Sequence, residues 1–300
     1  MASAIEIILI PTLMIVIGYL FKRLGILKPQ DSNVLSSIVI TVSMPAMIFL
    51  NLSKATIHPS LGILPITSII ISVIGMIIAY AYCKSRSYDK IKTWTIMIAA
   101  AMMNTGFIGY PITLGVFGEE GLIHAIFFDL VTPILFVAYG MILVREFGGD
   151  RKRVIREGLT FMPLWGVIFG LIANAVHFQP GYVIGSTLNY LSESTVPLIM
   201  LSLGLTINFR DVKKYMSDSV VVSAIRLLIA PCIVFITFSL LHITGMVFDV
   251  SVLESGMSTA MTALVLAITY KLDDRLMSSI ILVDVLLSLI TLTCWISLIM

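Results

Sequence analysis

The chain has 300 residues, of which 58% are hydrophobic and only 12% are charged, and its mean hydropathy is +1.05. A soluble domain carries about 25% charged residues, so this composition excludes an ordinary soluble domain and indicates an integral membrane protein. The net charge of +2 favours neither a nucleic acid nor an acidic macromolecule as partner.

Apolar segments long enough to cross a bilayer recur along the whole chain. A spanning helix needs roughly 20 apolar residues. The first segment is followed by Lys22 and Arg23, whereas a cleaved signal peptide carries its positive charge before the apolar core, so we expect it to be retained. We predict ten spanning helices, at about residues 4–21, 34–52, 61–83, 94–117, 122–144, 159–176, 184–207, 219–242, 250–270 and 277–300.

The basic residues predict the orientation of these spans. Seventeen of the 19 Lys and Arg residues fall in the loops on one side, and Lys54 is alone on the other. Positively charged loops stay in the cytoplasm, so we expect a multi-pass protein of the cell membrane with both termini outside. The seventeen are Lys22, Arg23, Lys28, Lys84, Arg86, Lys90, Lys92, Arg145, Arg151, Lys152, Arg153, Arg156, Arg210, Lys213, Lys214, Lys271 and Arg275.

A polar stretch at the midpoint divides the spans into two sets of five. We therefore expect a first repeat at residues 1–144, a cytoplasmic linker at 145–158 and a second repeat at 159–300. Pro45 and Pro197 are 152 residues apart, and Asp129 and Asp284 are 155 apart, each pair in a similar local sequence. An odd number of spans in each half inverts the second half, so the pattern predicts an inverted repeat, which is typical of transporters.

The fourth span contains a break. Gly106 and Gly109 weaken a helix, Pro111 removes a backbone hydrogen bond, and Asn104 and Thr105 add polar side chains at the same depth. An unwound segment in a membrane is tolerated only inside protein or beside a watery cavity. A kinked helix without a ligand is one interpretation; the other is the discontinuous helix of a secondary transporter, with substrate bound at the break.

The ninth span is the expected counterpart of the fourth. Its first half is small and polar through Ser258, Thr259 and Thr262, but it has no proline. Close helix packing explains such residues as well as a second break does. If both helices break, we expect them to cross there, and the N-termini of the half-helices then suit a carboxylate.

Three ionisable residues lie deep within spans: Asp129, Asp284 and Arg226. A charge at the centre of a spanning helix costs about 2.5–3.5 kcal/mol on insertion scales, so each needs a polar partner. They are candidates either for structural ion pairs or for a proton or cation relay. The cysteines and histidines show no metal-ligand spacing, so we expect neither a metal site nor a cofactor beyond H⁺ or Na⁺ as a coupling ion.

The motif Asn104-Thr105-x-x-x-Gly109-x-Pro111-x-x-x-Gly115-x-Phe117-Gly118 resembles the auxin efflux carrier family, and Val196-Pro197-Leu198 adds to the likeness. The resemblance implies an all-α, ten-helix membrane fold like that of bile-acid sodium symporters. It implies a scaffold of spans 1, 2, 6 and 7, a mobile transport domain of spans 3–5 and 8–10, and crossing spans 4 and 9. Family members often have a proline in span 9, where this chain has Ser258 and Ala263.

Three functions follow as hypotheses. The first is a carrier of small organic anions, auxin- or malonate-like carboxylates, working by elevator-type alternating access and not an enzyme. Its site residues would be Asn104, Thr105, Gly106, Gly109, Pro111, Ser258, Thr259 and Thr262, with Pro45 and Pro197 on the scaffold side.

The second hypothesis is a sodium-coupled symporter. Its oxygen ligands would come from the polar residues of both breaks, although no acidic residue is adjacent to them in sequence. The third is an intramembrane aspartyl protease that uses Asp129 and Asp284. Spans 2 and 7 are candidates for pairing with a second copy in a homodimer.

Overall fold

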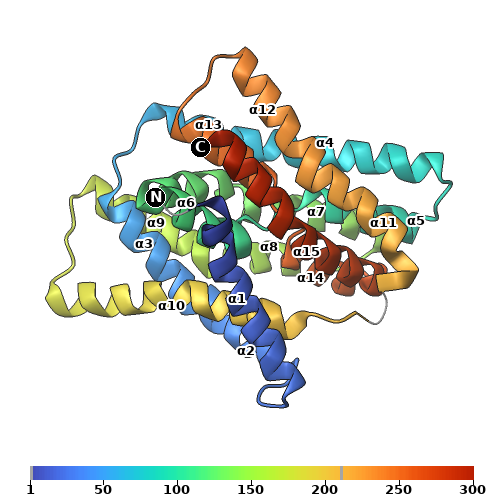
Figure 1. Cartoon of the computed structure of the whole chain (residues 1–300), viewed down its shortest axis with the longest axis horizontal. Helices are drawn as coiled ribbons and strands as arrows, with labels where there is room; N and C mark the ends of the chain where they lie inside the picture. Colours follow the sequence, from blue (N-terminus) through green and yellow to red (C-terminus); the bar gives the residue numbers. More distant parts are fainter. Residues whose placement is uncertain (1–2, 210–211) are drawn as a thin grey trace.

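The structure is a computed structural model, and it describes residues 3–209 and 212–300. The described residues are helical throughout, apart from connecting turns and one isolated antiparallel bridge (Figure 1). Arg210, one of the basic residues used to predict orientation, lies outside the described residues. The helices up to the midpoint are α1 (Ala4–Arg23), α2 (Asp31–Ile38), α3 (Met44–Lys54), α4 (Ile63–Ser85), α5 (Lys90–Ala101), α6 (Tyr110–Asp129), α7 (Thr132–Phe147) and α8 (Arg151–Leu159).

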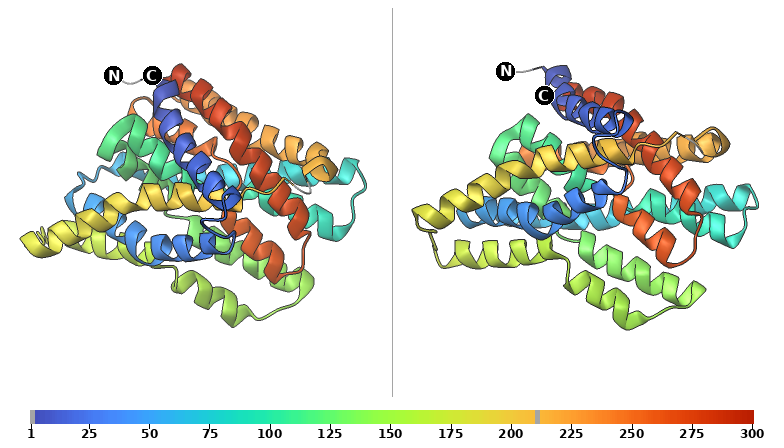
Figure 2. Two further views of the ribbon diagram at one scale, coloured as in Figure 1. Left: turned by 60° about the horizontal axis from the view of Figure 1, so that its bottom comes forward. Right: turned by 90° about the horizontal axis from the view of Figure 1, so that it is seen from below.

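The second half of the chain is helical as well. The start of α1 and the end of α15 lie at the same end of the molecule (Figures 1 and 2). Its helices are α9 (Met162–Ala175), α10 (Tyr182–Thr206), α11 (Val212–Ala224), α12 (Ala230–Leu240), α13 (Met246–Ser255), α14 (Met261–Thr269) and α15 (Asp274–Ile299).

Six helical stretches among the described residues are long and apolar enough to cross a membrane, and a bent pair formed by α8 and α9 makes a seventh. The chain is therefore a multi-span membrane protein. The predicted ten spans stay a prediction. The helices on either side of residues 102–104 and 256–260 are mostly too short to pass such a test, α10 is long enough but does not pass it, and Thr105–Phe147 passes as one stretch. The long stretch Thr105–Phe147 contains a non-helical residue, Gly118, with φ of 66°.

Three short π-helical segments each end two residues before a proline. They are η1 (Val39–Ser43) before Pro45, η3 (Thr105–Gly109) before Pro111, and η4 (Ile225–Ile229) before Pro231. A proline has no N–H to donate and its ring clashes with the carbonyl four residues earlier, so the preceding turn widens to keep its hydrogen bonds. The prolines thus set where these helices bulge.

The helices pack in two groups. The most extensive contacts of the first group are α1 with α10 and α3 with α9, and those of the second are α11 with α15, α4 with α5, and α12 with α13. In the first group Gly18 and Gly204 let two helices approach closely, since a Cβ on Gly204 would lie 2.2 Å from the Ile15 carbonyl oxygen. Figure 2 shows α3, α9 and α10 together at the left of the right-hand view, with α1 above them beside α15.

The linker predicted at 145–158 is not an irregular loop, because most of it forms α8. Asp150 caps this helix by accepting a hydrogen bond from the Lys152 N–H, and Arg153 pairs with Glu157 one turn later at 2.8 Å. A cap and an i,i+4 ion pair stabilise a short helix even where its surface is highly charged.

Candidate functional site

Two helix breaks lie side by side in the interior. The first separates α5 from η3 at Met102–Asn104, and the second separates α13 from α14 at Gly256–Ala260. The N–H of Asn104 donates to the Ser258 carbonyl and the N–H of Ala260 donates to the Met102 carbonyl, both at 2.9 Å. Backbone groups freed by each break are therefore satisfied by the other, which is the condition for unwound chain at membrane depth.

Asp129 joins the first break to the end of α6. Its carboxylate accepts hydrogen bonds from the Thr105 hydroxyl and, at 2.9 Å, from the Tyr110 hydroxyl. Thr105 and Tyr110 lie at the two ends of η3, so one carboxylate fixes the whole π-helical segment. Asp129 is itself the last residue of α6, next to the turn that leads into α7.

Asp284 has the same relation to the second break. It accepts from the Thr259 hydroxyl at 2.5 Å, from the Thr259 N–H at 3.1 Å and from the Ser223 hydroxyl. Sequence adjacency had suggested that no acidic residue accompanies the polar residues of the breaks. That expectation was wrong, because residues about 25 positions apart in the chain are brought together when neighbouring helices pack.

Arg226 is fully buried between the C-terminal ends of the two half-helices. Its guanidinium donates to the carbonyls of Ser255 and Met257 at 3.0 and 3.2 Å, and to that of Ala100 at 3.4 Å. Helix C-termini carry partial negative charge and unsatisfied carbonyls, so a cation here stabilises both. In the first half, Ser72 makes the matching contact, donating to the Ala101 carbonyl at 2.7 Å.

A small cavity of about 40 Å³ opens at the first break. Asn104, 2% exposed, has a side-chain nitrogen with no hydrogen-bond partner within the described protein. A buried amide N–H that lacks a partner costs free energy unless something binds it. The cavity is lined by Ile40, Met44, Met103, Asn104, Thr105, Gly106, Phe107, Asp129, Thr132, Phe161, Ala260, Met261 and Thr262.

The remaining predicted site residues have other surroundings. Ser258 and Thr259 join the two breaks through backbone and side-chain hydrogen bonds. Gly109 ends η3 and Pro111 is in the first turn of α6, and neither lines the cavity.

The two scaffold prolines also lie away from the cavity. Pro45 packs against Gly166 of α9, and Pro197 lies inside α10. Met44, next to Pro45, is the residue of this helix that reaches the cavity.

Sequence reasoning missed the residues that approach the cavity from outside the broken helices. They are Ile40, Met44, Thr132 and Phe161. Sequence reasoning also did not single out Glu254, which is fully buried near the end of α13. An acidic residue inside a predicted span, at 250–270, was the signal that could have singled it out.

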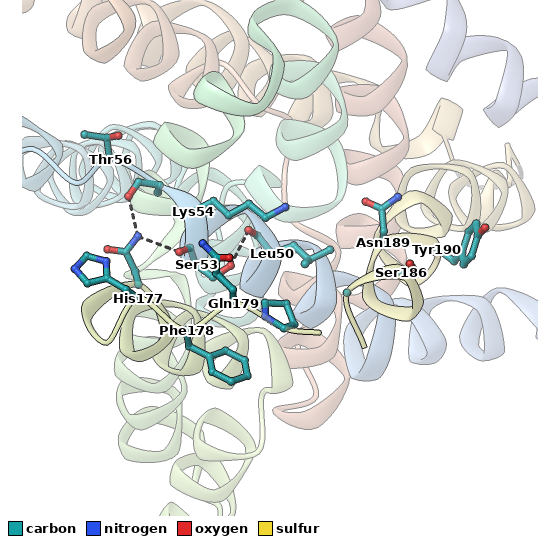
Figure 3. Close-up of a pocket in the computed structure, with 14 residues that line it drawn as sticks. Leu50, Ser53, Lys54, Thr56, His177, Phe178, Gln179, Ser186, Asn189 and Tyr190 are labelled. Carbon is teal, nitrogen blue, oxygen red and sulfur yellow. Dashed lines mark hydrogen bonds between the residues drawn. The ribbon is translucent and has the colours of Figure 1, made fainter. Parts of the chain in front are cut away.

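A much larger cavity, of about 940 Å³, lies at the ends of α3, α9 and α10 (Figure 3). Lys54 extends across it toward the wall that carries Ser186, Asn189 and Tyr190 (Figure 3). It is lined by polar and apolar residues alike and does not touch either break. Among the described residues no cluster of three or more His, Cys, Asp or Glu side chains could hold a metal ion.

Fold and site together define a multi-span membrane protein whose interior contains paired helix breaks tied down by buried carboxylates. Comparison with known sequences gives the class: a sequence model described as "Membrane transport protein" matches residues 3–296. The chain belongs to this family of membrane transport proteins, which confirms the resemblance drawn from the motif around Asn104. It is a transporter rather than an enzyme.

Named relatives cover nearly the full length. An uncharacterized transporter of Methanothermobacter thermautotrophicus is 40% identical over 97% of this chain and 96% of its own. An uncharacterized transporter of Methanocaldococcus jannaschii is 35% identical over 97% of each chain. A protein of Rhizobium meliloti named as a putative malonate transporter is 21% identical over 93% of this chain and 91% of its own.

Proposed function

We propose that the protein is a secondary carrier of small organic anions, with the substrate carboxylate bound at the cavity beside Asn104. The observation that carries this proposal is the buried Asn104 amide nitrogen, which has no partner in the described protein and lines the cavity. A carboxylate is an acceptor-only group that an amide N–H can bind. The relative named for malonate transport makes a small dicarboxylate the first substrate to examine.

The backbone around the cavity favours an anion as well. The segment η3 runs directly into α6, so its first N–H groups and the positive end of a long helix face the break. Asp129, the one carboxylate among the residues that line the cavity, is engaged by Thr105 and Tyr110. A small anion that accepts a hydrogen bond from Asn104 would therefore find the backbone N–H groups at the start of η3 already held in position.

We further propose that the chain is built from two inverted five-helix repeats, with spans 4 and 9 broken and crossing. Matched contacts in the two halves support this. Thr105 binds Asp129, 24 residues later, and Thr259 binds Asp284, 25 residues later. Ser72 caps α5 in the way that Arg226 caps α13.

The packing supports an elevator mechanism. We assign α1, α2–α3, α9 and α10 to a scaffold, and the remaining spanning helices, which carry both breaks, to a transport domain. The most extensive helix contacts lie within these groups rather than between them. The cavity lies between them, with Met44 from the scaffold side and Asn104 from the transport side. A sliding transport domain would move Asn104 past Met44 and carry the substrate with it.

Neither alternative is favoured. Arg226 places a fixed positive charge against carbonyls of both breaks and near Asp284, and this charge disfavours a sodium ion at the second break. For a protease, two carboxyls would have to share a proton. Asp129 and Asp284 instead bind threonines of different breaks, and no hydrogen bond joins them among the described residues.

We also propose that the basic loops face the cytoplasm and that both termini lie outside. Two ion pairs support a common side for several of these loops, since Lys90 pairs with Glu146 at 3.0 Å and Lys92 with Asp218 at 2.8 Å. The scaffold face around Pro45 and Trp165 is apolar and is where a second copy would pack in a homodimer.

The site is tested by malonate counterflow in proteoliposomes. Loss of a hydrogen bond to a charged group costs about 1.5–3 kcal/mol, so Asn104→Ala should lower malonate affinity by roughly 10- to 100-fold. Asn189→Ala, a change of the same kind in the large cavity, should leave counterflow near the wild-type rate. If Asn189→Ala abolishes counterflow and Asn104→Ala does not, the substrate binds in the large cavity and the proposal fails.

A further inference from the structure

Glu254 is a buried carboxyl that the proposed site does not use. It has no exposed surface, and its Oε1 accepts one hydrogen bond, from the Thr113 hydroxyl at 2.6 Å. Its second oxygen, Oε2, has no partner in the described protein. By contrast, Asp129 and Asp284 each accept two or more hydrogen bonds at the breaks.

Gly109 forms the pocket that holds this carboxyl. A Cβ at position 109 would lie 2.1 Å from Oε2 and 2.8 Å from the carboxyl carbon, so only glycine permits the contact. Gly109 is the last residue of η3, and Thr105, Gly106 and Phe107 of the same segment line the small cavity. The carboxyl and the proposed substrate site are therefore separated by a single turn of backbone.

The charges around Glu254 favour its protonated form. From α6 it faces Tyr110 and Asp129, the latter a second carboxyl. The segment η3 brings no ionisable side chain to Glu254. Arg226 of η4 is near in the chain's fold, but its guanidinium binds the carbonyl of Ser255, the residue after Glu254, and the carboxyl beside it is that of Asp284 in α15. The described parts of α4 and α12 bring no charged group to it. A buried carboxylate that has one donor and no ion pair among the described residues is strongly disfavoured.

The residue is also the exception to the matched contacts of the two halves. The breaks correspond through Thr105 with Thr259 and through Ser72 with Arg226, and on the same correspondence Glu254 falls opposite Ala100. A group needed only to hold the breaks together would be expected in both halves. A buried acid that is present at only one of the two breaks therefore indicates a role other than holding the breaks together.

We propose that Glu254 is the proton-binding residue that couples transport to protons. This inference rests on the proposed carrier function. In the state described here the proton is bound to the carboxyl, with Oε2 against Gly109. When the transport domain moves and water reaches the break, the proton leaves to that water, and the carboxylate formed stays solvated until it takes a proton back. Because η3 joins the two sites, the protonated and ionised forms present different cavities to the substrate.

The transport test uses malonate as the probe in proteoliposomes, with and without an inward proton gradient. Wild type should accumulate malonate with the gradient. Glu254→Gln, which copies the shape of the protonated acid, should keep malonate counterflow but lose gradient-driven accumulation by at least about 10-fold. Glu120→Gln, on an exposed turn of α6, should behave as wild type. Gradient-driven accumulation by Glu254→Gln, or counterflow in wild type with no effect of the gradient, overturns the proposal.

An infrared measurement on the purified protein tests proton binding without transport. The wild-type minus Glu254→Gln difference spectrum at neutral pH should contain the C=O stretch of a protonated carboxyl, and the difference with Glu120→Gln should not. Thr113→Val, which removes the one donor that the described residues supply to Glu254, should shift that band and serves for assignment if Glu254→Gln does not fold. An absent band shows that Glu254 is ionised and overturns this inference. Wild type that carries no malonate but shows the band contradicts the proposed substrate alone.

Discussion

At the scale of single residues, the two glycines of η3 have different tasks. Gly106 faces the cavity, where a Cβ would lie 3.7 Å from the Met44 side chain, an ordinary contact. Gly109 faces the interior, where a Cβ would overlap the Glu254 carboxyl. From sequence the two look alike, since both simply weaken a helix. The neighbour that each meets decides whether a methyl group affects substrate or stability.

We therefore expect Gly109→Ala and Gly106→Ala to separate stability from transport. Overpacking a buried site costs about 1–3 kcal/mol, so Gly109→Ala should lower the melting temperature in detergent, and adding Glu254→Ala should recover part of the loss. Gly106→Ala should melt like wild type but carry malonate more slowly, because its methyl group fills the cavity. Equal melting temperatures for the two single variants would contradict the assignment.

At the scale of helices, the breaks depend on what caps the C-terminal ends of α5 and α13. Ser72 supplies a neutral donor to α5, whereas Arg226 supplies a charge to α13 and also reaches the Ala100 carbonyl of α5. A hydrogen bond from a charged group contributes about 1.5–3 kcal/mol, compared with about 1 kcal/mol for a neutral one. Arg226 donates to three carbonyls at the breaks, whereas Ser72 donates to one. The two caps are equivalent in position and unequal in strength.

Arg226→Met should accordingly destabilise the protein much more than Ser72→Ala, which is the matched change in the other half. The difference is measured by heating both purified variants and recording the temperature at which each loses its monodisperse fraction. Arg275→Met, at an exposed position near the start of α15, should leave the melting temperature unchanged. If Arg226→Met melts no lower than Ser72→Ala, the guanidinium is not what holds the breaks together.

At the scale of the whole molecule, the question is whether the two helix groups move relative to each other. Ile7 of α1 and Gly115 of α6 face each other between the groups, since a Cβ on Gly115 would lie 3.2 Å from the Ile7 side chain. Ser36 and Ser202 face each other within the proposed scaffold, with their hydroxyls 2.7 Å apart. Because the residues of each pair lie against each other, cysteines at these positions are candidates for engineered disulfides.

A disulfide between Ile7→Cys and Gly115→Cys should stop malonate counterflow, and a reductant should restore it, because the link would join the proposed scaffold to the proposed transport domain. The pair Ser36→Cys and Ser202→Cys should form its disulfide without loss of counterflow. Both are made after replacing the exposed Cys232 and Cys294. Full counterflow with the first disulfide closed would exclude an elevator movement across that contact.

Composition, span periodicity and the motif from Asn104 to Gly118 were enough to determine the class of protein, because twenty-residue apolar segments have no other stable environment and because glycine and proline interrupt a helix wherever they occur. They also drew attention to Asp129, Asp284 and Arg226, whose burial has to be compensated.

Only the tertiary structure decided which groups provide that compensation. Asp129 and Asp284 bind the threonines of the breaks, Arg226 binds carbonyls instead of either carboxylate, and the second break forms without a proline because the first break supplies its hydrogen bonds. The structure also distinguished Glu254 from these residues, because it showed that Glu254 has one donor at the second break while Asp129 and Asp284 have two or more each. A side chain's partners come from helices distant in sequence, and local pattern contains no record of which helices pack together.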